Sequence, residues 1–365
     1  MGMPNVRRWP GWAALAIVFT AGCSSGNSSS GSAGNGGGAG TTGSAGTTGA
    51  AGRGGSTGSA GTNGAAGRGG GNGTAGTTGA GGTNGSAGRG GTTGSAGTTG
   101  AAGTGGATPS SGCNAASWPT ASPQSIDVTD TRGNTMSRQF YFTLPASYDP
   151  SHAYPVVFAW HYAGGQASQI AGTGFSGNYY GIRPNFPNAI YVAPQGLTGP
   201  ATDAGAGQTG WPNTNGQDIA FARAMVTWFE GNFCVDQARL MSTGFSYGAI
   251  MSHTIACQMS DVFRAVGVMS GASFGGSCNT HEIAAWITHG DADPMVSFSS
   301  GESARDRIVT LNHCGSTTHA VDPSPCVQYD GCDTGYPVVW CPVAGEGHNI
   351  PSFAASALAT FFQQF

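Results

Sequence analysis

The sequence contains no lysine, and its few charges are spread unevenly along the chain. All 17 acidic residues lie beyond residue 112, together with 8 of the 13 arginines, so residues 113–365 carry a formal charge of 8 − 17 = −9. The C-terminal region is therefore more acidic than the whole-chain value of −4 indicates. Because an acidic surface repels phosphate backbones, this charge argues against a protein that binds nucleic acid.

Residues 24–112 lack the side chains that build a core. This stretch has no aromatic residue, no acid and no branched aliphatic residue, yet it holds 36 of the 66 glycines. It cannot bury enough apolar surface to offset the entropy of ordering, so we do not expect a folded globular unit here. The remaining 365 − 112 = 253 residues are long enough for one large domain with a substantial core.

Glycine occupies every third position in a frame that runs from Gly31 to Thr108. This period is typical of collagen, but the frame contains no proline, which collagen-like sequences carry in abundance. Two interpretations stay open, a flexible tether and a triple helix or other packed glycine-rich rod. As a coil, about 85 residues have a root-mean-square span of roughly 50 Å, enough to hold a domain clear of a membrane surface.

The apolar run near the N-terminus is short. Two arginines precede apolar residues 13–19, which are too few to span a bilayer. A basic, an apolar and a small-residue segment in this order predict a secretory signal over residues 1–22, followed by a low-complexity linker over 23–112. The run from Thr20 to Cys23 resembles the lipobox of bacterial lipoproteins, which predicts a lipid anchor on Cys23 at the membrane. The alternative is ordinary cleavage that leaves a free cysteine. Either way we expect an exported protein, extracellular or at the cell surface.

No C-x-x-C pair occurs, which argues against a zinc or dithiol redox site. Setting Cys23 aside leaves an even number of cysteines in the C-terminal region. An even number in an exported domain predicts a framework of disulfides, although the pairing cannot be read from the sequence. The cysteines concerned are Cys113, Cys234, Cys257, Cys278, Cys314, Cys326, Cys332 and Cys341.

Residues 113–365 alternate buried strands with helices. This alternation predicts an α/β fold with a mostly parallel central sheet flanked by helices. Residues 137–144 alternate apolar and polar side chains and predict an antiparallel edge. The predicted strands are 156–160, 189–193, 239–245, 263–269, 284–289 and 338–343, and the predicted helices are 219–229, 249–259, 300–311 and 353–362.

Residues 244–248 read Gly-Phe-Ser-Tyr-Gly, a G-x-S-x-G motif between a predicted strand and a predicted helix. The flanking glycines allow strand and helix to approach closely, and the turn pushes the Ser246 hydroxyl outward. We therefore predict that Ser246 is a nucleophile, with a purely structural turn as the alternative. The backbone N–H of Tyr247, at the start of the helix, is a predicted donor to an oxyanion.

A serine hydroxyl needs a base that takes its proton. In α/β-hydrolases, which share this strand–turn–helix arrangement, an acid and then a histidine follow the serine along the chain. His348 follows the last predicted strand and is the predicted base. The H-G-x-x-D-x-x-V run that begins at His289 selects Asp293 as the acid, which would orient the imidazole. Asp291 better suits shaping the turn, and Glu346 is a weaker alternative.

In α/β-hydrolases the second oxyanion donor lies on a loop that follows an early strand, and here the loop after the predicted strand 156–160 has that position. It looks like the H-G-x-G type, but Tyr162 stands where a glycine is usual. The backbone N–H of Tyr162 or of Ala163 is the predicted donor, and the sequence does not distinguish between the two. We expect the His161 side chain only to end the strand and bond to neighbouring backbone.

The stretches around these motifs resemble the secreted feruloyl esterases of type C and the overlapping polyhydroxybutyrate depolymerase-like esterases of carbohydrate esterase family one. The resemblance runs from about Gln139 to the C-terminus. It rests on Phe233-Cys234-Val235-Asp236, Phe263-Arg264-Ala265-Val266, Met269-Ser270-Gly271, Asn312-His313-Cys314 and the cysteine-rich block 326–341.

This resemblance implies an exported serine esterase that releases hydroxycinnamic acids such as ferulate from plant cell-wall polysaccharide. No metal or cofactor is implied, and we expect a monomer. A feruloyl ester needs a flat apolar slot, for which the loop residues Trp211 and Phe175 are candidates, with packing as the alternative. A polyester depolymerase and an acetylxylan esterase are rival activities. Outside enzymes, the rival is a surface binding protein on an inactive hydrolase scaffold.

Overall fold

The computed structural model describes residues 106–198, 207–273 and 278–365. The predicted signal, the candidate lipidation site Cys23 and almost all of the glycine frame lie outside these residues. Within them, no helix combines the length and the apolar character that crossing a membrane requires.

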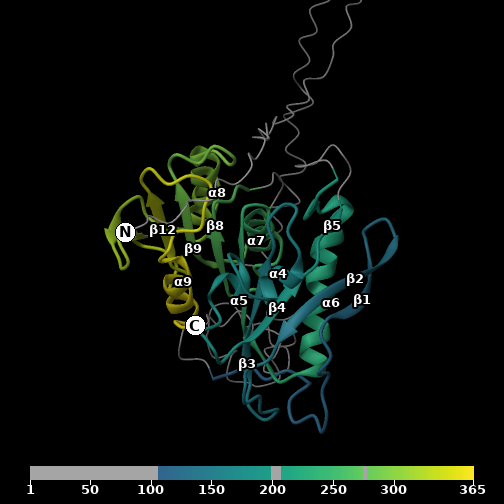
Figure 1. Ribbon diagram of the computed structural model, residues 1–365. Helices are drawn as coiled ribbons and strands as arrows, with labels where there is room; N and C mark the ends of the chain where they lie inside the picture. Colours follow the sequence, from purple (N-terminus) through teal and green to yellow (C-terminus); the bar gives the residue numbers. More distant parts are fainter. Residues whose placement is uncertain (1–105, 199–206, 274–277) are drawn as a thin grey trace, which may run out of the picture. The chain divides into compact units, whose positions relative to one another are not determined.

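The described part of the chain forms a ten-stranded sheet (Figure 1). Its strands are β1 (Gln124–Thr129), β2 (Thr135–Thr143), β3 (Tyr154–Trp160), β4 (Ile190–Pro194), β7 (Val235–Phe245), β8 (Ala265–Met269), β9 (Ala284–Gly290), β10 (Thr318–Ala320), β11 (Val327–Tyr329) and β12 (Val338–Val343). They are ordered β1-β2-β4-β3-β7-β8-β9-β12-β11-β10. The central strands from β4 to β12 pair in parallel, and the pairs at both edges are antiparallel. The predicted α/β fold with a mostly parallel sheet is confirmed.

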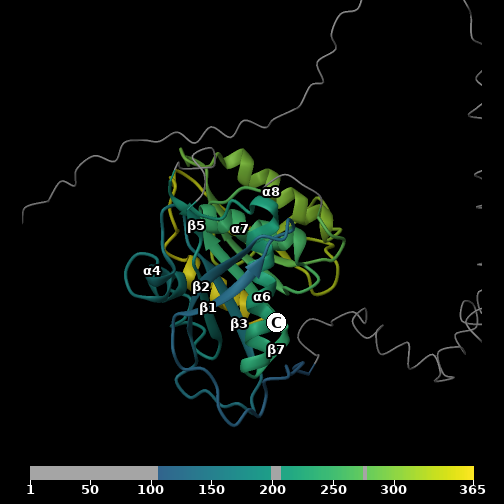
Figure 2. The ribbon, with the colours of Figure 1, turned by 90° about the vertical axis from the view of Figure 1, so that its right-hand side faces the viewer.

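Helices cover both faces of this sheet, which is why its central strands are continuous apolar runs. Helices α6 (Gln217–Asn232), α7 (Tyr247–Gln258) and α8 (Phe298–Leu311) contribute to the core on one face. Helices α4 (Ala167–Ala171), α5 (Gly177–Tyr180) and α9 (Ala354–Phe362) contribute to the core on the other. Figure 2 shows α4 and α8 on opposite sides of the strands. Every residue of β3 and of β9 is buried as a result.

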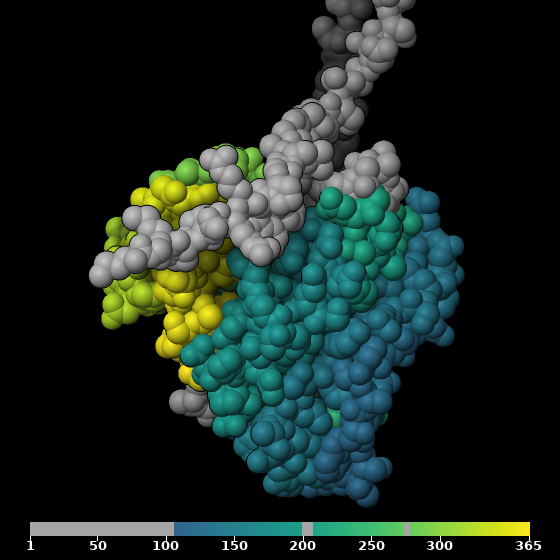
Figure 3. Space-filling view, in the orientation of Figure 1, coloured from purple at the N-terminus to yellow at the C-terminus, as the bar shows by residue number. Residues whose placement is uncertain are grey.

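The order of the strands carries distant parts of the chain to opposite ends of the sheet. In Figure 3 the earliest described segments, in blue, and the latest, in yellow, lie on opposite sides of the face shown. The strands between them, β3, β7, β8 and β9, therefore lie at the centre of the sheet. Functional loops that follow central parallel strands gather at one edge, where their carboxyl ends meet.

The folded domain begins earlier than the sequence indicated. Residues before Cys113 bond to the segment around β7: the Thr108 N–H donates to the Asp236 carboxylate at 3.0 Å, and the Ser110 hydroxyl donates to the Phe233 carbonyl at 2.7 Å. The expected boundary at residue 113 thus falls inside a packed segment, and the end of the assigned linker belongs to the domain.

Four disulfides join the eight cysteines of the domain, as the even number predicted. The pair Cys113–Cys234 ties the entry segment to the residue before β7, across a sequence separation of 121. The other pairs span 15 to 21 residues and fasten the end of α7, the end of α8 and the β10–β11 hairpin. These pairs are Cys257–Cys278, Cys314–Cys332 and Cys326–Cys341.

Candidate active site

Ser246 lies in the sharp turn between β7 and α7. Its backbone has φ 57° and ψ −119°, a conformation that residues with a side chain rarely adopt. The glycines on either side are required by close packing. A Cβ on Gly244 would lie 2.3 Å from the carbonyl carbon of Gly248, and a Cβ on Gly248 would lie 2.0 Å from the Trp160 carbonyl oxygen. The predicted motif therefore folds as a crowded turn that presents the serine hydroxyl.

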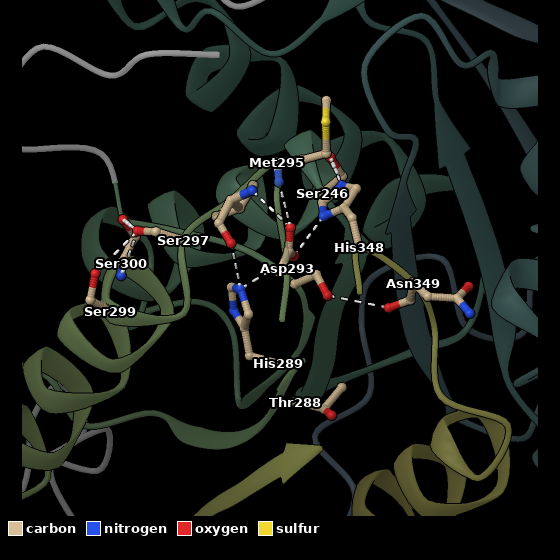
Figure 4. A network of polar contacts seen from close by, with 12 residues as sticks. Ser246, Thr288, His289, Asp293, Met295, Ser297, Ser299, Ser300, His348 and Asn349 are labelled. Atoms are coloured by element: carbon tan, nitrogen blue, oxygen red, sulfur yellow. Dashed lines mark hydrogen bonds and ion pairs between the residues drawn. The ribbon is translucent and has the colours of Figure 1, made fainter. Parts of the chain in front are cut away.

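The structure brings together the three side chains that the sequence singled out (Figure 4). The Ser246 Oγ lies 2.8 Å from His348 Nε2, and His348 Nδ1 lies 2.7 Å from Asp293 Oδ2. The serine follows β7, the carboxylate follows β9 and the histidine follows β12. Three separate loops thus form one hydrogen-bonded chain at the carboxyl edge of the sheet.

The Asp293 carboxylate is fixed by hydrogen bonds to both of its oxygens. Oδ1 accepts the backbone N–H groups of Met295 at 2.8 Å and Val296 at 2.9 Å. Burial alone would raise the pKa of Asp293, but the hydrogen bonds from His289, His348 and these N–H groups outweigh it and hold the pKa well below its usual range. The carboxylate therefore stays ionised at ordinary pH and can only accept. It selects the His348 tautomer that carries its proton on Nδ1, which leaves Nε2 free to accept from the serine.

The loop that carries Asp293 is interlocked with the loop that carries His348. The Gly345 N–H donates to the Asp291 carboxylate at 2.6 Å, so Asp291 holds the neighbouring loop rather than only its own turn. The Glu346 carboxylate accepts from Asn349 at 2.9 Å and has no bond to the histidine ring. Of the three acids considered, only Asp293 is bonded to His348.

The candidate oxyanion loop is held by hydrogen bonds to its carbonyl groups. The Trp211 indole N–H donates to the His161 carbonyl at 2.8 Å, and His161 Nδ1 donates to the Tyr162 carbonyl at 2.8 Å. In a trans peptide the C=O and the following N–H point in opposite directions. Fixing these two carbonyls therefore fixes the N–H directions of Tyr162 and Ala163. The loop adjoins the serine turn, since the Tyr162 and Phe245 rings lie 6.3 Å apart.

The His161 side chain is buried and neutral. Burial lowers its pKa to about 4. Its Nε2 accepts the Gly196 N–H at 2.9 Å while its Nδ1 donates to the Tyr162 carbonyl. The expectation that this side chain ends the strand and bonds to neighbouring backbone is confirmed, and the bond it makes sets the direction of one candidate donor.

Comparison with known proteins identifies the family. No family model matches the chain. Feruloyl esterase D from Neurospora crassa is 34% identical over 230 residues, which cover 59% of this chain and 75% of that protein. Feruloyl esterase C from Emericella nidulans is 31% identical over 229 residues, which cover 61% of this chain and 80% of that protein. The chain belongs to the feruloyl esterase family.

As a member of the feruloyl esterase family, the protein is a carboxylic ester hydrolase. A solved structure has the same fold. The acetyl xylan esterase from Aspergillus awamori matches with a TM-score of 0.50 and 17% identity, covering 67% of this chain and 100% of that one. The resemblance that the sequence motifs indicated is thus confirmed for family and fold.

The prediction that Trp211 lines a substrate slot is wrong for this feruloyl esterase family member. Its side chain is fully buried and packs edge-on against Trp160, with ring centroids 4.8 Å apart. A fully buried ring cannot line a substrate slot, and the Trp211 indole N–H instead holds the loop after β3 through the His161 carbonyl. Phe175 is different, because it is 68% exposed and its ring lies 6.3 Å from that of Phe245. The Phe245 ring in turn lies 4.7 Å from the His348 imidazole, so Phe175 remains a candidate.

Several residues support the site in ways that the sequence did not predict. The Tyr180 hydroxyl donates to the Trp160 carbonyl at 2.6 Å and holds the end of β3. The Ser270 hydroxyl donates to the Asn349 carbonyl at 3.2 Å, next to the histidine. No local pattern indicates these two supporting roles. His289, by contrast, stood within the motif that selected Asp293, and its side chain lies against that carboxylate.

The crowding at the turn predicts a contrast between two glycine substitutions. Gly248→Ala should destabilise the protein by several kcal/mol, because its new Cβ meets the Trp160 backbone and neither segment can move away. Gly231→Ala is the matched control, since this glycine lies in helix α6 with no atom within 4 Å of the added Cβ. It should stabilise by about 0.5–1 kcal/mol. Urea unfolding of both variants measures the difference, and similar effects at the two positions would contradict the steric account.

Proposed function

We propose that this protein is an exported serine esterase that hydrolyses feruloyl and related hydroxycinnamoyl esters of plant cell-wall polysaccharide. The observation that carries the proposal is the unbroken hydrogen-bonded chain from Ser246 through His348 to Asp293, with links of 2.8 and 2.7 Å. Membership of the feruloyl esterase family supports the choice of acyl group.

In the proposed first half-reaction, Ser246 Oγ attacks the ester carbonyl and its proton passes to His348 Nε2. The carbonyl carbon becomes tetrahedral and its oxygen becomes negative. Asp293 stabilises the imidazolium that forms, without itself taking the proton. His348 then donates this proton to the leaving sugar oxygen as the carbon–oxygen bond of the ester breaks. The acyl group is left on the serine and the polysaccharide hydroxyl departs.

In the second half-reaction, water takes the place of the sugar hydroxyl. His348 Nε2 accepts a proton from the water as it attacks the acyl carbon, and then donates it to Ser246 Oγ as the acyl bond breaks. The products are the free hydroxycinnamic acid and the regenerated serine. The same base and the same oxyanion donors serve both halves.

The proposed oxyanion donors come from the two segments that meet at the serine. Tyr247 begins helix α7, so its N–H belongs to the positive end of the helix dipole. The loop after β3 supplies the N–H of Ala163 or of Tyr162, whose directions are fixed by the bonds to the preceding carbonyls. Preorganised donors of this kind contribute on the order of 10²–10³ in rate each.

The aromatic acyl group fits the exposed ring at the site. Phe175 lies next to Phe245, which lies next to the His348 imidazole, at centroid distances of 6.3 and 4.7 Å. The exposed Phe175 ring is separated from the His348 imidazole only by the Phe245 ring, so it offers a flat apolar surface on which a ferulate ring can pack. We therefore propose that Phe175 contacts the acyl group.

The rest of the chain is proposed to deliver and hold the enzyme. Residues 1–22 are proposed as the signal, a lipid on Cys23 as the anchor and the glycine block as the tether of a monomeric catalytic domain. The four disulfides support an oxidising, extracellular setting.

A panel of esters tests the proposed substrate class. The full chain, exported with its disulfides formed, is assayed with methyl ferulate, acetylated xylan and a short hydroxybutyrate oligomer. We expect methyl ferulate to give the highest kcat/KM, and Ser246→Ala to lower it by on the order of 10⁶. In Phe175→Ala, kcat/KM should fall about tenfold for methyl ferulate and little for acetylated xylan.

Each outcome of the panel separates the rival functions. Preference for acetylated xylan or for the oligomer would replace the feruloyl assignment by an acetylxylan esterase or a polyester depolymerase. No turnover of any ester above the Ser246→Ala background would point instead to a binding protein on an inactive scaffold.

The support of the oxyanion loop by Trp211 gives a second test. Trp211→Phe keeps a buried ring but removes the N–H that holds the His161 carbonyl, so the Tyr162 N–H loses its fixed direction. We expect kcat to fall about 10- to 100-fold with KM nearly unchanged, because the donor acts mainly in the transition state. Trp118→Phe, at a half-buried position that contacts Tyr148, is the control and should leave kcat unchanged. Equal kinetics in the two variants would exclude this role of Trp211.

A further inference from the structure

His289 is a fully buried histidine, in strand β9, that the proposed reaction does not use. Its Nε2 lies 2.9 Å from the Val296 carbonyl oxygen and 3.4 Å from Asp293 Oδ2. Both of these groups are acceptors, so Nε2 carries a hydrogen that faces the two oxygens together. The ring thus joins the carboxylate to the loop that follows it.

This contact completes the set of donors around the Asp293 carboxylate. Two backbone N–H groups occupy Oδ1, and His348 and His289 approach Oδ2 from different sides, as Figure 4 shows. The backbone bonds fix the position of one oxygen only. A carboxylate held only at Oδ1 can still rotate about that atom. The His289 N–H opposes this rotation at Oδ2, which accepts the hydrogen bond from His348 Nδ1.

The fold provides a dedicated place for the ring. Gly301 lies in the first turn of helix α8, and a Cβ there would lie 2.2 Å from His289 Nδ1. The Phe298 ring meets the imidazole edge-on at a centroid distance of 5.9 Å. Within the described part of the chain, Nδ1 has no hydrogen-bond partner, so the ring is oriented by its Nε2 bonds and by this close packing.

We propose that His289 is a positioning residue for the reaction, which acts through Asp293. Its Nε2–H bridges the Val296 carbonyl and the Asp293 carboxylate, and so keeps Oδ2 aimed at His348 Nδ1. The proposal rests on the proposed function of the Ser246, His348 and Asp293 side chains. It makes the hydrogen-bonded chain four residues long, with the fourth member buried beneath the site.

A merely structural histidine and a positioning histidine differ in what can replace them. Glutamine places an amide N–H near the position of the imidazole Nε2, so His289→Gln keeps the donor in a smaller shape. Leucine fills the space with apolar atoms and keeps no donor, so the carboxylate loses this bond. If only packing matters, the two variants behave alike; if the donor matters, they differ in kcat.

The experiment uses the full chain and p-nitrophenyl acetate, a small activated ester that needs no aromatic slot. For His289→Leu we expect kcat to fall about 100-fold with KM within threefold of wild type. For His289→Gln we expect kcat within about tenfold of wild type. Thermal unfolding of both variants is measured in parallel, and the loss of kcat should not follow the loss of stability.

Gly301→Ala tests the same contact if His289→Leu does not fold. The added Cβ collides with the imidazole and displaces it, so kcat should fall at least tenfold although alanine is normally the better helix residue. Ser303→Ala, exposed on the same helix, is the matched control and should leave kcat unchanged. Wild-type kcat in Gly301→Ala would overturn the proposal, as would equal kcat in His289→Leu and His289→Gln.

Ser246→Ala separates this proposal from the proposed function. If Ser246→Ala still hydrolyses p-nitrophenyl acetate at the wild-type rate, the assignment of the nucleophile fails and the His289 proposal falls with it. If Ser246→Ala is inactive but His289→Leu retains wild-type kcat, only the positioning role is overturned.

Discussion

The backbone contact between Gly248 and Trp160 is the constraint on which the site depends. The start of α7 lies so close to the end of β3 that a Cβ on Gly248 would come within 2.0 Å of the Trp160 carbonyl oxygen. This contact joins the turn that presents Ser246 to the strand that leads into the candidate oxyanion loop. The separation between the Ser246 turn and the loop after β3 is therefore set by backbone atoms in the core, which move less than exposed side chains do.

Three histidines belong to the site or support it, and the acceptors around each ring set which nitrogen carries its proton. His161 donates from Nδ1 to a backbone carbonyl and stays neutral because burial lowers its pKa. His289 donates from Nε2 to a carbonyl and to Asp293. His348 donates from Nδ1 to the same carboxylate and keeps Nε2 for the serine. The two buried rings contact the loop after β3 and the Asp293 carboxylate, and the half-buried ring of His348 lies against the Ser246 hydroxyl.

Much of this arrangement could be predicted from the sequence, because its strongest signals are local. Buried parallel strands are continuous apolar runs, so β3, β4, β8, β9 and β12 were found to within a few residues. The serine turn and the acid loop are marked by local motifs of fixed spacing, and the order of the parallel strands then brings Ser246, Asp293 and His348 together. The remaining features depend on packing between distant segments. The pairing of the cysteines, the burial of Trp211 and the edge strand β1 required the folded chain, and α5 was missed because Asn178 and Tyr179 adopt positive φ values.

Covalent acylation of Ser246 is the step on which the proposed reaction depends. Its most direct test is rapid acid quenching of the full chain during turnover of a p-nitrophenyl ester of ferulic acid, followed by mass spectrometry of the digested protein. We expect a feruloyl adduct on the peptide that contains Ser246, formed together with the first equivalent of p-nitrophenol and absent from Ser246→Ala. An adduct on another residue, or turnover in Ser246→Ala at the wild-type rate, would contradict it.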